Sequence, residues 1–184
     1  MPKKPKERIR EQLDREAMLS YLHHRGTALT AEQEIAIDAA IDEAIMLSNP
    51  KSIARVFRLS TVDDKVEIEG GPILTTKDLA RTLRGSENVV VVACTLGHEV
   101  VRQIKRHMIT RPSDGVLLDA AASALVEALA DVVHRDLPRP EGHAVGTRYS
   151  PGYGDLTLEH QEALLELIGA QQKLGIHTNT GHLM

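Results

Sequence analysis

One short segment decides the fold class of this chain: NVVVVAC, residues 88–94. Its near-continuous apolar run is typical of a strand that is buried on both faces. The strand leads through Thr95-Leu96-Gly97 into a predicted helix over residues 98–109. The longest predicted helix follows, from about residue 112 to 135, because its apolar positions form one wide stripe at helical spacing. A strand that feeds two helices indicates a fold in which helix and sheet are mixed.

Upstream of this strand, the pattern changes from helical to β-type. Residues 52–59 and 65–69 are predicted strands, the second because apolar and charged residues alternate in it. Gly70-Gly71-Pro72 is a predicted turn. Thr76 is expected to cap a short helix over residues 77–83.

The N-terminal part is predicted to be helical. Asp14 can cap a helix that runs to residue 22. Thr30 and Gln33 form a capping-box pattern at the start of a second helix, which Asn49-Pro50 ends.

Downstream, residues 138–146 are a predicted loop and residues 158–174 a predicted final helix. The order of elements predicts an α+β (mixed α/β) fold rather than a regular βαβ alternation. We expect one domain with a short, twisted, mostly antiparallel sheet, flanking long helices and an N-terminal helical arm. Residues 1–50 would form the helical region, packed on a core of residues 51–184.

Composition restricts the possible functions. The hydrophobic share is 42%, but with three Tyr, one Phe and no Trp the core must consist of aliphatic side chains. A formal charge of −4 gives no general reason to expect nucleic-acid binding. The longest apolar stretch is too short to span a bilayer, and no secretory signal is recognisable. The single cysteine, Cys94, fits a reducing compartment, so we expect a cytoplasmic protein without membrane contact.

One window stands out for its chemistry: TRYSPGYGD, residues 147–155. Arg148 offers a rigid fork that suits a carboxylate, and Tyr153 offers a π face for a planar base or a cationic sulfonium. Pro151 and Gly152 allow a tight turn and a close backbone approach. The residue types alone favour a different interpretation, a surface arginine and a turn whose tyrosines fill gaps in the core.

The pattern Arg148-x-x-Pro151-Gly152-Tyr153 resembles the signature of the activation domain of cobalamin-dependent methionine synthase. Supporting similarity lies in Ala128-Leu129-Ala130-Asp131 and in Thr95-Leu96-Gly97. The resemblance covers roughly residues 14 to 184 and is closest to a stand-alone version of that domain.

This resemblance implies that the window binds S-adenosylmethionine. Arg148 and the backbone that follows would hold the ligand, and Tyr153 would lie at the reacting end near the corrin. Tyr149, Ser150, Pro151 and Gly152 would be backbone or close-approach contacts. Glu141 lies near the place of an acidic residue that assists binding in the family, although the register of that loop is open.

The resemblance also implies partners. The cobalamin would be carried on another polypeptide, a cobalamin-dependent methionine synthase or a related corrinoid protein, and a one-electron donor such as flavodoxin or ferredoxin would reduce it. Some proteins ligate cobalt through the His of an Asp-x-His-x-x-Gly loop. Residues 141–146 depart from that pattern, because Glu141 stands in place of the Asp before His143, so we expect no cobalamin bound by this chain itself. The nine histidines are scattered without a His-x-x-x-His pair, so we expect no metal site.

The expected role is that of an accessory component that supports reductive re-methylation of cobalamin, with little chemistry of its own. Two alternatives stay open. One is a non-enzymatic docking subunit of a corrinoid methyltransferase that does not bind S-adenosylmethionine. The other is an unrelated α+β protein in which the Pro-Gly-Tyr turn is coincidental.

Overall fold

The computed structural model describes residues 3–26, 28–139, 144–176, 178–179 and 182–183. These residues group into two compact units, one of residues 1–51 and 94–137 and one of residues 52–93 and 138–184. Each unit has its own apolar core. The division of the chain after residue 50 stays a prediction.

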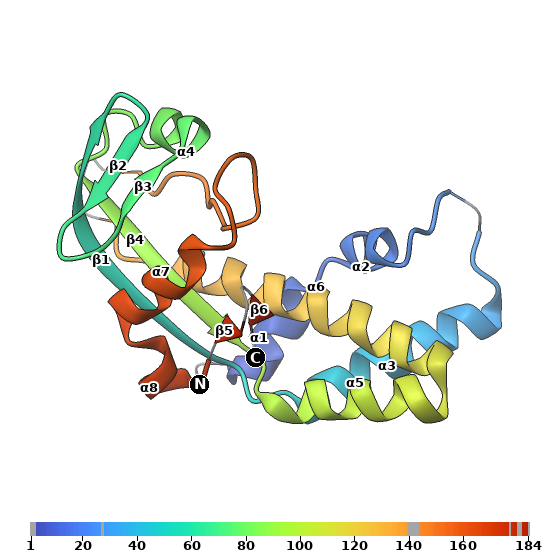
Figure 1. The fold of residues 1–184 in the computed structure, drawn as a ribbon. Helices are drawn as coiled ribbons and strands as arrows, with labels where there is room; N and C mark the ends of the chain where they lie inside the picture. The colour runs from blue at the N-terminus through green and yellow to red at the C-terminus, as the bar shows by residue number, and fades with distance from the viewer. Residues whose placement is uncertain (1–2, 27, 140–143, 177, 180–181, 184) are drawn as a thin grey trace. The chain divides into compact units, whose positions relative to one another are not determined.

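The first unit is helical and is assembled on one long central helix, α6 (Pro112–Asp136). Against α6 pack α1 (Pro5–Gln12), α2 (Arg15–Tyr21), α3 (Ala31–Leu47) and α5 (His98–Thr110) (Figure 1). The core consists of small aliphatic side chains from α6, such as Ala121, Ala124 and Leu125, with single anchors such as Ile9 and Met18 from the short helices. Because alanine side chains are small, the helix axes can approach closely along the buried stripe. Close packing of this kind fits a chain with few large aromatic side chains.

The predicted helix starts in this unit are confirmed. The Asp14 side chain accepts hydrogen bonds from the backbone N–H groups of Glu16 and Ala17, and so caps α2. Thr30 and Gln33 form the reciprocal capping box of α3.

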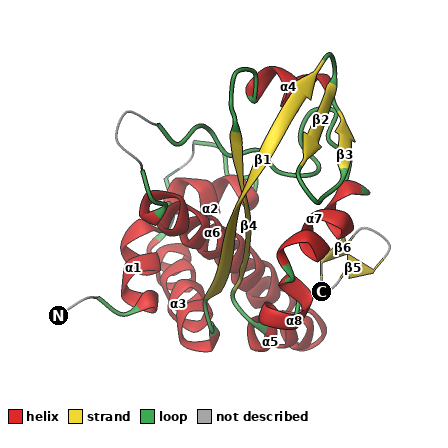
Figure 2. Ribbon diagram, turned by 90° about the vertical axis from the view of Figure 1, so that its left-hand side faces the viewer, coloured by secondary structure: helices red, strands yellow, loops and turns green. Residues whose placement is uncertain are grey.

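The second unit contains a sheet with strand order β3-β2-β1-β4. Its strands are β1 (Lys51–Val62), β2 (Lys65–Ile68), β3 (Ile73–Thr75) and β4 (Asn88–Thr95). β1, β2 and β3 are connected as antiparallel neighbours, with Thr61 opposite Val66 and Val66 opposite Leu74. Figure 2 shows the strong twist of β1 and β4. The mixed fold class with a mostly antiparallel sheet is therefore confirmed.

The inward face of the sheet carries Phe57, Val66, Ile68 and Leu74 and packs against α7 (His160–Ile168) and α8 (Ala170–Leu174). A short helix, α4 (Lys77–Thr82), follows β3, and a small hairpin of β5 (Thr178–Asn179) and β6 (His182–Leu183) ends the chain.

Two predictions about elements are wrong. The strand at residues 88–94 forms and lies at the edge of an antiparallel sheet, but it is not buried on both faces, since Ala93 is buried while Asn88 and Val92 are exposed. The predicted final helix is broken at Gly169, whose φ of +69° places it in the left-handed region that ends α7.

Among the described residues, no helix combines the length and the apolar character that a membrane span requires.

Candidate functional site

The predicted window, residues 147–155, forms no strand in the structure but a compact turn beside α4 (Figure 1). The Gly152 N–H donates to the Leu156 carbonyl at 2.7 Å, and the Tyr153 N–H donates to the Ser150 carbonyl at 3.1 Å. Gly152 and Gly154 have φ values of +95° and +53°, which side chains with a Cβ rarely adopt. The two glycines thus allow the chain to fold back on itself within a few residues.

The turn is anchored at its C-terminal end by Asp155. This carboxylate accepts hydrogen bonds from the Thr76 hydroxyl, from the backbone N–H of Lys77 at 2.6 Å and from that of Asp78 at 3.3 Å. The Thr76 hydroxyl in turn accepts from the Leu79 N–H at 3.3 Å and so caps α4. The next residue of the turn, Leu156, is buried in the core under α4.

These hydrogen bonds favour the ionised carboxylate. The Thr76 hydroxyl bond is the largest cause that lowers the pKa of Asp155, and the Lys77 and Asp78 N–H groups lower it further, against an opposing effect of desolvation. Asp155 therefore carries its negative charge at the positive end of the α4 backbone under ordinary conditions.

Tyr149 closes the turn from the other side. Its hydroxyl donates to the carbonyl of Tyr153 at 3.2 Å. Desolvation, followed by the charges of Asp78 and Asp155, raises the pKa of Tyr149, so the phenol stays protonated and able to donate. A Cβ on Gly154 would lie against the Tyr149 hydroxyl and 2.6 Å from Oδ2 of Asp78, so a side chain directly after Tyr153 would have to displace one or both of these groups.

Most of the other predicted residues that the structure describes are exposed. Arg148 and Ser150 are exposed, Pro151 is half-buried, and the Tyr153 side chain is 69% exposed. Glu141, the predicted acidic partner, lies outside the described residues, as does His143. The structure therefore groups Arg148 to Tyr153 on one turn, with the Arg148 and Tyr153 side chains exposed.

Sequence reasoning missed the contribution of α4. Thr76 was identified as a helix cap, but its contact with Asp155 joins residues 79 positions apart in the chain. Nothing local in the sequence indicates such a pairing, since Thr76 and Asp155 each fit an ordinary cap or turn.

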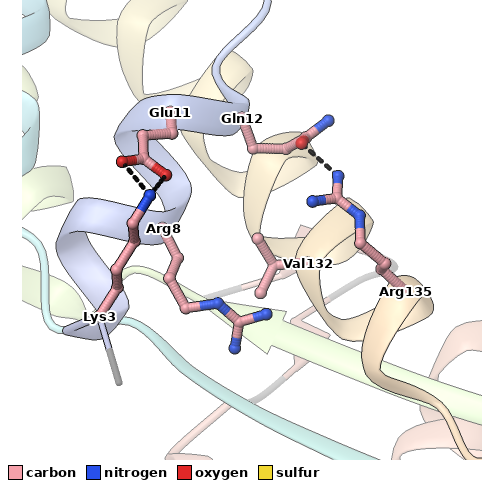
Figure 3. A pocket seen from close by; sticks show the side chains of 6 residues that line it. All are labelled: Lys3, Arg8, Glu11, Gln12, Val132 and Arg135. Atoms are coloured by element: carbon pink, nitrogen blue, oxygen red, sulfur yellow. Dashed lines mark hydrogen bonds and ion pairs between the residues drawn. The ribbon is translucent and has the colours of Figure 1, made fainter. Parts of the chain in front are cut away.

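A second place to look for a ligand is a surface hollow of about 450 Å³ in the helical unit. Figure 3 shows two contacts among the side chains that line it: Lys3 contacts Glu11, and Arg135 contacts Gln12. Arg8 pairs with both carboxylate oxygens of Asp136 at 2.7 Å. Lys3 and Arg8 are thus paired with carboxylates, whereas Arg135 is held by the uncharged amide of Gln12. Within the described ranges, no group of three or more His, Cys, Asp or Glu side chains is placed to hold a metal ion.

Comparison with known proteins places the fold. No protein-family model matches the sequence, and no curated protein matches it. Among solved structures, the chain shares its mixed α/β fold with the crystal structure of the MetH reactivation domain bound to AdoHcy. The TM-score is 0.72 at 14% sequence identity, and the match covers 95% of this chain and 71% of that chain. At this identity the similarity shows the fold.

Proposed function

We propose that this protein binds S-adenosylmethionine and supports the reductive re-methylation of a cobalamin carried by another polypeptide. The observation that carries the proposal is the coincidence of two independent features. The fold is that of a domain crystallised with AdoHcy, the demethylated form of S-adenosylmethionine. In addition, the Arg148-x-x-Pro-Gly-Tyr153 window forms a locked turn that leaves Arg148 and Tyr153 exposed.

Each exposed residue of the window has a chemical role in this proposal. The Arg148 guanidinium binds the carboxylate of the methionine part, where a charged, bidentate pair is strong and directional. The Tyr153 ring lies near the sulfonium end, because an aromatic face attracts a cation. Gly152, at φ +95°, lets the backbone approach the ligand closely between Ser150 and Tyr153.

Tyr149, Ser150 and Pro151 complete the window, and Glu141, which precedes it in the sequence, is proposed as an acidic contact. In this scheme the protein binds and aligns its ligand, and the sulfonium supplies the methyl group. A general base is not required. The corrinoid partner and a one-electron donor, such as a flavodoxin or a ferredoxin, would supply the cobalt and the reducing electron.

Isothermal titration calorimetry of the full chain tests ligand binding directly. We expect micromolar affinity for S-adenosylmethionine, about −8 kcal/mol, and measurable binding of S-adenosylhomocysteine. Saturating ligand should also raise the melting temperature by mass action. ATP is the control, because it shares the adenosine group but lacks the amino-acid carboxylate.

Absence of heat and of a melting shift at millimolar S-adenosylmethionine would contradict the proposal. Stable association with a corrinoid methyltransferase under those conditions would instead favour a docking subunit that binds no ligand.

A further inference from the structure

The contact between Asp155 and the start of α4 involves more hydrogen bonds than a surface turn needs. The carboxylate accepts from the Thr76 hydroxyl and from the Lys77 and Asp78 N–H groups. Thr76 is itself buried, with 1% of its surface exposed, and its oxygen accepts from Leu79 at the same time. Asp155 is thus tied to the backbone of a structural element far away in the sequence.

The shape of the window depends on this tie. Gly154 lies directly before Asp155 and is packed against Tyr149 and Asp78. The hydroxyl of Tyr149 holds the carbonyl of Tyr153. Any movement of Asp155 away from α4 would displace Gly154 and with it the Tyr149–Tyr153 hydrogen bond, because all four of these residues lie within residues 149–155.

We propose that Asp155 and Thr76 are positioning residues of the ligand-binding window. They do not contact the ligand. They hold the turn on α4 so that Arg148 and Tyr153 are preorganised for binding, which lowers the ordering cost that a mobile loop would incur. The inference rests on the proposed S-adenosylmethionine site.

The carboxylate is required for this tie. An asparagine side chain has the same shape but only one acceptor oxygen, and its NH₂ group would face a backbone N–H donor. Asp78 and Arg81 on α4 act, together with Asp155, on the phenol of Tyr149. Arg81 pairs with Asp78 at 2.9 Å.

The test measures S-adenosylmethionine affinity by calorimetry for four full-chain variants, together with amide NMR spectra without ligand. Asp155→Asn removes the tie, and Glu159→Gln removes a carboxylate from an exposed position on the same segment. Thr76→Val removes the hydroxyl, and Thr76→Ser keeps it. We expect Asp155→Asn and Thr76→Val to weaken binding about 10-fold or more, whereas Glu159→Gln and Thr76→Ser bind like the wild type.

The NMR spectra separate positioning from general damage. In Asp155→Asn the amide signals of Lys77, Asp78 and Tyr153 should shift while those of the helical unit stay in place. Unchanged affinity in a folded Asp155→Asn protein, or equal losses for Thr76→Ser and Thr76→Val, would overturn the inference alone. A wild-type chain that binds no S-adenosylmethionine would overturn the proposed function and this inference with it.

Discussion

The Tyr149 hydroxyl donates a hydrogen bond to the backbone carbonyl of Tyr153 at 3.2 Å. The two tyrosines of the window differ in their burial. Tyr149 is half-buried and part of the core packing under α4, whereas Tyr153 is 69% exposed. One aromatic residue holds the turn and the other is presented by it.

This difference predicts that the same substitution affects stability at one tyrosine and not at the other. Tyr149→Phe removes the hydroxyl bond and should destabilise the protein by about 0.5–1.5 kcal/mol. Tyr153→Phe should leave stability unchanged, because its hydroxyl lies on an exposed side chain. Denaturant unfolding of both variants measures the difference, and equal stability of the two would show that the Tyr149 bond contributes nothing.

Gly154→Ala tests the close packing of Gly154 against Tyr149 and Asp78. The added Cβ would lie against the Tyr149 hydroxyl and 2.6 Å from Oδ2 of Asp78, at a φ of +53°. Gly85→Ala is the matched control, because Gly85 also has a positive φ, +79°, but no atom lies within 4 Å of its added Cβ. We expect the control to cost roughly 1 kcal/mol of backbone strain, and Gly154→Ala to cost clearly more. Equal costs would mean that the turn has room to adjust.

The elements of this fold could be predicted from sequence where the signal is local. Asp14 and Thr30 mark helix starts because a cap satisfies nearby backbone donors, and both caps are present. The edge position of the strand at residues 88–94 could not be predicted, because strand order is decided by partners such as β1 that lie far away in the chain.

The same limit applies to the candidate site. The window was recognisable from its residue types, since Arg, Pro, Gly and Tyr stand in one short segment. Its anchor was not, because the contact of Asp155 with Thr76 exists only after β3 and α4 have folded beside the turn.

The close approach of α5 and α6 gives a prediction that reverses the usual helix rule. Alanine in place of a helical glycine ordinarily stabilises a helix by up to about 1 kcal/mol. At Gly115, however, a Cβ would lie 2.8 Å from the Met108 backbone nitrogen and 3.2 Å from the His107 backbone carbon. Backbone atoms cannot yield easily, so Gly115→Ala should destabilise the protein by about 1–3 kcal/mol. Asp119→Ala, at an exposed position of the same helix, should be nearly neutral. Stabilisation by Gly115→Ala would contradict this packing.

The pair of Glu43 and His107 predicts a pH dependence of stability. His107 is 2% exposed, and its Nε2 lies 3.1 Å from Oε1 of Glu43, which also accepts from Gln103 at 2.8 Å. Desolvation raises the pKa of Glu43, but the bonds from Gln103 and His107 and the charge of Arg111 outweigh it, so the net pKa is lowered from 4.5. Ionised Glu43 therefore stabilises the fold above its unfolded-state pKa, and this stabilisation is lost as pH falls through the lower folded-state pKa.

Glu43→Gln should accordingly reduce the free energy of unfolding most at neutral pH, and the difference from wild type should shrink below pH 4.5. Unfolding curves across this range measure the difference. Glu32→Gln, at an exposed position in the first turn of the same helix, controls for the loss of a carboxylate. A difference that stays constant with pH would show that the charge of Glu43 is not involved.

Arg148→Ala and Tyr153→Phe should fail in different ways if the window binds S-adenosylmethionine. Loss of the Arg148 guanidinium removes a charged hydrogen bond to the ligand carboxylate and should weaken affinity roughly 10-fold or more. Arg84→Ala, which removes an exposed arginine elsewhere in the same unit, should bind like the wild type.

Tyr153→Phe keeps the aromatic face, so its affinity for the ligand should change little. It should instead slow reactivation of a cobalamin-dependent methionine synthase at saturating ligand. Calorimetry, melting temperature and partner reactivation for all three variants distinguish these effects. Equal affinity of the wild type and Arg148→Ala would refute the assignment of Arg148, because an arginine that merely lies on the surface would leave ligand binding unchanged.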